Sequence, residues 1–343
     1  MYFILASLLI LLSVIEFIAK STLYKRIALF IGASAMVLFA GLRYQVGTDW
    51  DAYFVNYKLQ QWDTEWGYKY LNLFFSKYLQ APFNLLLITI NLVSLYLISK
   101  YIKNLSGNYI IALLIFYSDL FMYYNLSGMR QAIATSFTCF ALIFAVKKQM
   151  KMFLFFTVVA CLFHVTSVVF LAVYFLPRKS LSFKNLILIS LSFVIVIFIS
   201  NNYIQAIDYL SKKSEFYTEI QENDENLLFL FAIGLAKRSI IIIVFLLLYD
   251  KLKHIPNLLY YFNIYLIGFI IYASLYMVSP DFGVRFSSYY TIVDMILVGN
   301  IIYFIKSRPV KAFLFILFVC LSLYKVSVYA GEKTYEYDTI LNQ

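Results

Sequence analysis

Cations and carboxylates gather where apolar stretches end, in a chain that has few charged residues. One such group is the stretch Gly-Leu-Arg-Tyr-Gln-Val-Gly-Thr-Asp-Trp-Asp-Ala-Tyr, from Gly41 to Tyr53. It sets Arg43 at the end of an apolar segment and places Asp49 and Asp51 shortly after it. A guanidinium donates two parallel hydrogen bonds to phosphate oxygens, and a carboxylate accepts a proton. The stretch therefore predicts a site for an anionic ligand beside an apolar segment.

Three further arginines lie within apolar stretches or at their ends. Arg130 opens one stretch, Arg238 follows Lys237 inside another, and Arg285 opens a third. Ionisable residues in such positions are costly and mark functional sites by default. An isolated arginine there can simply extend its head group to the interface, but four on one face favour a shared ligand. Because the planar guanidinium fork matches phosphate oxygens, we predict that Arg43, Arg130, Arg238 and Arg285 bind a pyrophosphate.

A lone histidine, His164, lies at the centre of a 25-residue apolar run from Met152 to Leu176. Imidazole is the side chain most often used for proton transfer in enzymes. His164 is therefore our first candidate for a general base, and Asp49 is the second. The alternative is an ordinary helix in which His164 is hydrogen-bonded to a neighbouring helix.

The triplet Asp49-Trp50-Asp51 resembles the acid pair that holds a metal in nucleotide-sugar glycosyltransferases. It also allows a capping box, in which Thr48 caps a helix and Asp51 completes the motif. We favour the second interpretation and predict neither a metal nor a cofactor. Four residues are predicted to support the site or contact sugar: Trp50, Asp51, Asp281 and Tyr289. Asp281 has the alternative role of pairing with Arg285.

The composition shows that these residues belong to an integral membrane protein. The 343 residues are 63% hydrophobic and only 13% charged, whereas soluble domains are roughly 25% charged. A spanning helix needs about 20 mainly apolar residues. We predict an all-α polytopic membrane helical bundle with about ten spans, at residues 2–19, 27–42, 84–99, 108–124, 129–146, 185–203, 227–249, 257–278, 287–305 and 312–329.

Basic residues occur in short clusters at helix ends. Such clusters orient a protein in the membrane and do not indicate nucleic-acid binding. Six clusters hold 16 of the 28 Lys and Arg residues: 20–26, 100–103, 147–151, 178–184, 251–253 and 306–311. We place all six in the cytoplasm. Both termini and the loops 43–83 and 204–226 then lie outside. We detect no repeat and no soluble domain, so residues 1–343 are predicted to form a single membrane domain.

One segment conflicts with simple alternation of helices across the membrane. The apolar run around His164 lies between Lys151 and Arg178, and a single crossing would move Arg178 and Lys179 outside. A broken pair of half-helices, at about 152–162 and 165–176, enters from the cytoplasm and returns, so the charge rule holds. Non-helical backbone at membrane depth is tolerated where it lines a cavity. We predict this re-entrant pair, with His164 at its tip.

Four short motifs together resemble those of the EpsG-like, Wzy-type polysaccharide polymerases. They are the Val-Gly-Thr-Asp that follows Arg43, Met-Arg-Gln-Ala-Ile-Ala from Met129, Leu-Phe-His-Val-Thr-Ser from Leu162, and Arg-Phe-Ser-Ser-Tyr-Tyr from Arg285. Each is short, but their order and spacing over residues 40–305 match that family. The resemblance implies a GT-C-like membrane glycosyltransferase.

The resemblance also implies the reaction and its partners. Such an enzyme, in the bacterial inner membrane, joins undecaprenyl-pyrophosphate-linked oligosaccharide units into O-antigen, capsule or exopolysaccharide chains at the periplasmic face. A sugar hydroxyl of the acceptor attacks the donor's anomeric carbon, and the lipid pyrophosphate leaves. Donor and acceptor lipids, the membrane and a chain-length co-polymerase are the implied partners. A flippase for the same glycolipid and an O-antigen ligase are the alternatives.

Overall fold

The structure is a computed structural model that describes residues 1–343 except 20, 63, 180–226, 278 and 343. Its described residues are mainly helical, and seven helices are long and apolar enough to span a membrane. They are α1 (Tyr2–Ala19), α2 (Thr22–Gly41), α5 (Phe83–Leu105), α7 (Met129–Val146), α11 (Leu227–Leu247), α13 (Leu258–Leu275) and α16 (Arg308–Gly331). The predicted all-α polytopic membrane protein is confirmed. The predicted span 185–203 lies outside the described residues.

Two predicted spans are interrupted. The span at 108–124 is α6 (Tyr109–Phe116), which continues into the π-helix η2 (Tyr117–Asn125). The span at 287–305 is divided between α14 (Pro280–Thr291) and α15 (Asp294–Phe304). The break falls at Ile292 and Val293, which together with Thr291 form a run of three β-branched residues. Such residues lose side-chain freedom in a helix.

The described residues group into two compact units. The first contains residues 1–174 and 295–343, and the second contains residues 175–294. The first unit carries Arg43, Arg130 and His164, and the second carries Arg238 and Arg285. The single membrane domain stays a prediction.

The segment around His164 is a broken pair of helices that turns back at His164, as predicted; that the pair enters the membrane from the cytoplasm stays a prediction. Helix α8 (Met150–Phe163) ends at His164, whose backbone is extended with φ −157° and ψ 114°, and the 3₁₀-helix η3 (Val165–Phe175) follows. Near the end of η3 the Tyr174 hydroxyl donates to the Lys148 carbonyl at 3.1 Å. The ring centroids of Tyr174 and Phe153 are 5.3 Å apart. Helix η3 therefore runs back along α8 to the place where α8 begins.

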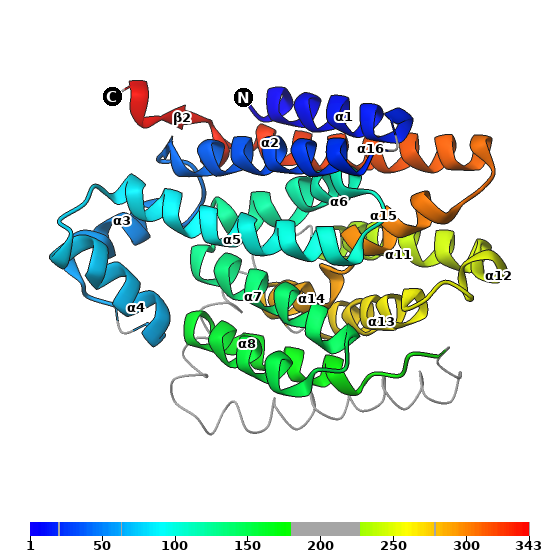
Figure 1. The fold of residues 1–343 in the computed structure, drawn as a ribbon. Coiled ribbons are helices and arrows are strands. Elements are labelled where there is room, and N and C mark those ends of the chain that lie inside the picture. Colours follow the sequence, from blue (N-terminus) through cyan, green and yellow to red (C-terminus); the bar gives the residue numbers. More distant parts are fainter. Residues whose placement is uncertain (20, 63, 180–226, 278, 343) are drawn as a thin grey trace. The chain divides into compact units, whose positions relative to one another are not determined.

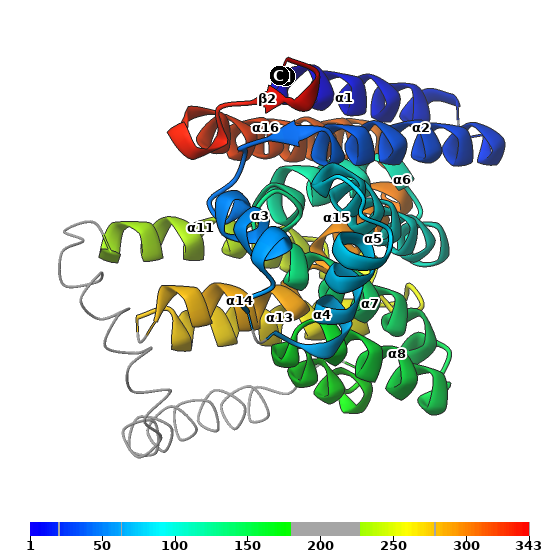
Figure 2. The ribbon, with the colours of Figure 1, turned by 90° about the vertical axis from the view of Figure 1, so that its left-hand side faces the viewer.

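Both chain ends lie at the same end of the first unit as residue 43. Strand β1 (Arg43–Tyr44) pairs antiparallel with β2 (Asp338–Thr339). The Tyr2 ring contacts the rings of Phe39 and Tyr337. Figures 1 and 2 show α1, α2 and α16 side by side, with β2 at the end where α2 finishes. The termini thus share one membrane face with loop 43–83; that this face is outside stays a prediction.

The return of η3 along α8 gives a topology prediction. In a background with Cys139, Cys161 and Cys320 replaced by serine, single cysteines at Gln149 and Lys179 are expected to resist an impermeant thiol reagent in intact cells. Both should react after the cells are opened. A cysteine at Asp51 is the control that should react in intact cells. If only one of the cysteines at positions 149 and 179 reacted in intact cells, the prediction that both lie at the cytoplasmic face would be wrong.

Candidate active site

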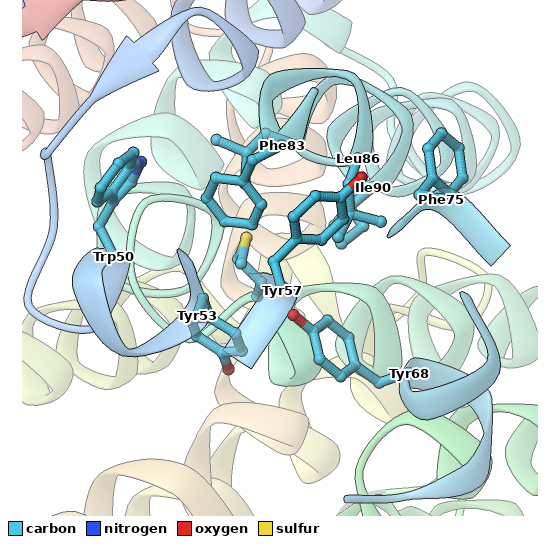
Figure 3. Close-up of a cluster of buried hydrophobic side chains, with 10 residues drawn as sticks. Trp50, Tyr53, Tyr57, Tyr68, Phe75, Phe83, Leu86 and Ile90 are labelled. Atoms are coloured by element: carbon cyan, nitrogen blue, oxygen red, sulfur yellow. The ribbon is translucent and has the colours of Figure 1, made fainter. Parts of the chain in front are cut away.

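The loop 43–83 folds into a small aromatic cap on the first unit. It contains α3 (Trp50–Leu59), α4 (Trp66–Leu73) and the π-helix η1 (Phe74–Tyr78). Trp50, Tyr53 and Tyr57 are spaced at three and four residues, so they share one face of α3. This face is buried against Phe83 and other residues at the start of α5. Figure 3 shows Trp50 and Tyr57 beside Phe83 of α5, and Tyr53 beside Tyr68 of α4.

Helix α4 lies close against the end of α8 because Gly67 has no side chain. A Cβ at Gly67 would lie 2.7 Å from the Leu162 carbonyl oxygen, which is closer than such atoms approach in proteins. Glu65 immediately precedes α4. The close packing therefore sets the Glu65 carboxylate beside the break between α8 and η3.

Glu65 joins two of the predicted site residues. One carboxylate oxygen accepts a hydrogen bond from Arg130 Nη1 at 2.7 Å. The other lies 2.9 Å from His164 Nδ1 and 3.4 Å from the backbone nitrogen of Val165, which donates to it. Arg130 Nε donates to the Tyr53 hydroxyl at 3.4 Å. His164, Glu65, Arg130 and Tyr53, hereafter the His164 cluster, thus form one hydrogen-bonded group from four separate elements.

The charges of the His164 cluster keep Glu65 ionised. Burial raises the pKa of Glu65, but the hydrogen bond from His164 and the charge of Arg130 lower it more, to about 2. Burial raises the pKa of Tyr53, so its hydroxyl stays neutral at pH 7. An ionised Glu65 can accept only, which requires Nδ1 of His164 to carry a proton. Nε2 of His164 is buried and makes no hydrogen bond within the described part of the chain.

The lowered pKa of Glu65 predicts how stability depends on pH. Its folded value of about 2 lies below the unfolded value of 4.5, so its stabilisation is complete above pH 4.5 and is lost as the pH falls toward 2. We expect Glu65→Gln to lower the free energy of unfolding by roughly 1–2 kcal/mol at pH 7, which is less than the full pKa shift corresponds to because solvent screens the partly open site. The difference in unfolding temperature from the unmodified protein should shrink between pH 5 and 3. Asp51→Asn, which changes an exposed carboxylate of the same loop, should cause little difference at any pH.

The C-terminal segment holds the loop that carries Arg43 and Asp49. The Gly47 nitrogen donates to the Thr334 carbonyl at 2.9 Å. Ser127 accepts from the Thr48 nitrogen at 3.0 Å and lies 2.9 Å from the Tyr335 hydroxyl. Gly47 has φ 100°, and a Cβ there would lie 2.1 Å from the Leu126 carbonyl oxygen. Only glycine fits this turn.

A substitution at Gly47 should therefore disturb the candidate active site, although Gly47 is not itself a residue of the His164 cluster. Gly47→Ala is expected to lower the free energy of unfolding by about 1–3 kcal/mol and to reduce activity, because the turn between Arg43 and Asp49 must shift. Thermal unfolding and product formation are the measurements. Gly331→Ala, at a position with nothing within 4 Å of the added atom, is the matched control. Equal unfolding temperatures for the two variants would contradict the role of the turn.

Comparison with known proteins identifies the family. The EpsG family model matches residues 26–339, a range that includes the re-entrant pair and every residue of the His164 cluster. The chain belongs to the EpsG family. A search of curated proteins and a search of solved structures each found no match. The GT-C-like fold therefore stays a prediction for this EpsG-family protein.

Three predicted site residues of this EpsG-family chain lie in the cap without joining the His164 cluster. Asp49 accepts from the Thr48 hydroxyl at 3.1 Å and begins the helix turn that ends at Tyr53. Its side chain does not cap α3, and the expected capping box between Thr48 and Asp51 does not form. Asp51 is exposed. Trp50 is buried in the aromatic core, so packing accounts for it; its role at the site stays a prediction.

Arg43 is fully buried in the first unit. It donates to the backbone carbonyls of Ala40 and Val46. Its Nη2 has no hydrogen-bond partner among the described residues. Burial lowers the pKa of Arg43 to about 10, so the side chain stays charged at pH 7. These hydrogen bonds fix the turn of the loop that carries Arg43. Its binding to pyrophosphate stays a prediction.

The remaining four predicted site residues lie in the second unit. Arg238 donates to the Gly234 carbonyl at 3.1 Å, and its guanidinium carbon lies 3.7 Å from the centre of the Tyr272 ring. Arg285 Nε is 2.6 Å from an Asp281 oxygen, one helical turn away in α14. The alternative pairing predicted for Asp281 is therefore present. Tyr289 is buried in the same helix.

Two residues of the His164 cluster escaped the sequence analysis. Glu65 is the only glutamate in loop 43–83, within the run Trp-Asp-Thr-Glu-Trp, but nothing in that run indicates which cation it meets. Tyr53 is one aromatic residue among many. Within the described part of this EpsG-family chain, no group of three or more His, Cys, Asp or Glu residues could hold a metal.

Proposed function

We propose that this EpsG-family protein is a membrane glycosyltransferase that polymerises lipid-linked oligosaccharides, with the His164 cluster as its acid–base centre. The observation that carries the proposal is Glu65, whose two oxygens hold Nδ1 of His164 and Nη1 of Arg130 at 2.9 Å and 2.7 Å. This arrangement orients a base and a cation next to each other. Both are needed when a hydroxyl displaces an anionic leaving group.

The Glu65 contact sets the tautomer of His164. With the proton on Nδ1, Nε2 has a free lone pair and can take the proton of an acceptor sugar hydroxyl. The oxygen then forms a bond to the donor's anomeric carbon as the bond from that carbon to the pyrophosphate oxygen breaks. A single displacement of this kind inverts the anomeric centre. The proton held by His164 is afterwards released to solvent.

Arg130 is placed to stabilise the leaving group. Nη1 contacts Glu65 and Nε contacts Tyr53, whereas Nη2 donates no hydrogen bond within the described part of the chain. The Arg130 side chain is 27% exposed, so a phosphate oxygen can reach it. Charge that develops on the pyrophosphate is lowered in energy by such a preorganised cation. Arg43, Arg238 and Arg285 are the further cations of the proposed pyrophosphate site.

The buried Nε2 of His164 has a consequence for substrate entry. The atom must come into contact with a hydroxyl, so the side chains that cover Nε2 have to move aside when the acceptor binds, while Glu65 stays on Nδ1. The proposed acceptor and donor are undecaprenyl-pyrophosphate-linked repeat units at the outer face of a bacterial inner membrane. A chain-length co-polymerase is the proposed protein partner.

The proposal is tested by reconstituting the full chain in liposomes with lipid-linked repeat units. A ladder of products that differ by one repeat unit is expected with the unmodified protein and not with His164→Ala. Movement of the glycolipid across the bilayer without a ladder would identify a flippase and overturn the proposal. Transfer of one preformed chain to a second acceptor, without chain growth, would identify a ligase.

A further inference from the structure

An apolar groove runs between α2 and α5 in the first unit, away from the His164 cluster. The two helices pack along each other (Figure 1), and the cavity between them has a volume of about 490 Å³. This size is within the range of ligand pockets. Small residues, Ala33 and Ser34, form part of its floor, and Phe30, Leu38 and Leu92 are exposed along its sides. No described side chain fills it.

One end of this α2–α5 groove is strongly basic. Arg26 lies in the first turns of α2, and Lys100 and Lys103 lie in the last turns of α5. These three cations are at the opposite end of α2 and α5 from loop 43–83, which leaves α2 after Gly41 and enters α5 at Phe83. Among the described residues none of the three has a carboxylate within 4 Å.

One of these cations, Lys100, also lies beside an aromatic ring at the groove wall. Lys100 Nζ lies 5.1 Å from the centre of the Tyr96 ring, and Tyr96 itself is exposed and lines the groove. The groove thus combines a long apolar trough with an anion-binding end. A soluble anion would use only the second of these features, and a neutral lipid only the first.

We propose that the α2–α5 groove binds an anionic glycerophospholipid, with an acyl chain along the apolar trough and its phosphate at Arg26, Lys100 and Lys103. Basic pockets between membrane helices at the cytoplasmic face bind anionic head groups, and each cation near such a surface contributes measurably. The positive-inside rule places this basic end at the cytoplasmic face. The lipid would hold α2 and α5 together at the end opposite the aromatic cap.

The test measures lipid binding by the purified, delipidated full chain with native mass spectrometry. Dioleoylphosphatidylglycerol is expected to be retained at least about tenfold more strongly than dioleoylphosphatidylcholine, since only the former carries a net charge for the three cations. Joint substitution Arg26→Gln, Lys100→Gln and Lys103→Gln should remove this preference. The matched control is Lys147→Gln, Lys148→Gln and Lys151→Gln, three exposed cations outside the groove, which should leave the preference unchanged.

A second variant tests the trough without changing charge. Ser34→Phe should fill the trough and weaken phosphatidylglycerol binding at least about fivefold, whereas Ser34→Ala should not. Equal retention of the two lipids by the unmodified protein would overturn the proposal, and that comparison needs no variant. An equal loss of binding in both charge triples, or no effect of Ser34→Phe, would also overturn it. Because lipid binding is measured without substrate, the result is independent of the polymerase activity.

Discussion

His164→Ala is expected to slow polymer formation by about 10²- to 10⁴-fold, which is the usual contribution of a general base. The physical reason is the contact between Nδ1 and Glu65, which leaves Nε2 as the only ring nitrogen able to accept a proton. Binding of the lipid-linked substrate should change much less, because the arginines remain. The measurements are the turnover rate in proteoliposomes and the retention of radiolabelled substrate by the purified protein.

Glu65→Gln separates the role of the base from that of its orienting group. The amide keeps the shape of Glu65 but is neutral, so it no longer fixes the protonated Nδ1 or balances the charge of Arg130. We expect a rate loss of about tenfold or more, smaller than that of His164→Ala. Thr157→Ala, which removes a buried hydroxyl that donates only to Phe153 of its own helix, is the control within α8.

Normal turnover in His164→Ala would remove His164 from the mechanism and leave Asp49 as the base to test.

Arg130→Lys is expected to abolish long polymer and to lower turnover by about 10²- to 10³-fold, the cost of losing one preorganised donor to a developing negative charge. Arg130 contacts Glu65 and Tyr53 with two of its nitrogens, and the proposed mechanism gives the third to a phosphate oxygen. A lysine ammonium cannot span these groups in the same geometry. Product length on gels and protein level in the membrane are the measurements.

Arg285→Lys is the companion variant in the second unit. Arg285 is held by Asp281 through Nε, and we expect a similar loss of long polymer because lysine lacks the planar guanidinium fork. Arg308→Lys, at an exposed cation outside the proposed sites, should support normal product length. If both lysine variants at 130 and 285 made polymer of normal length, the pyrophosphate clamp would be wrong. A matching loss of protein would instead indicate that these arginines stabilise the fold.

The membrane helices could be predicted because their signals are local. A spanning helix must satisfy its backbone within its own segment and present apolar side chains to lipid, so hydropathy identifies it without knowledge of its neighbours. The break at His164 was predicted in the same way. The positive-inside rule favours one membrane face for Lys151 and Arg178, and a pair of half-helices that returns meets this expectation whereas a single crossing does not. The structure adds that the returning half is a 3₁₀-helix.

The partners of the charged residues depended on the tertiary structure. Glu65 meets Arg130 and His164, which are 65 and 99 residues away along the chain, because Gly67 lets α4 pack against α8. Arg43 resembles Arg130 in the sequence, yet one is fully buried on backbone carbonyls and the other is partly exposed beside the base. The sequence by itself determined which residues are charged and which segments are apolar enough to cross a membrane. Only the packing of the cap decided which charges meet, because the energy of a charge pair falls with distance and rises with burial, and neither is encoded locally.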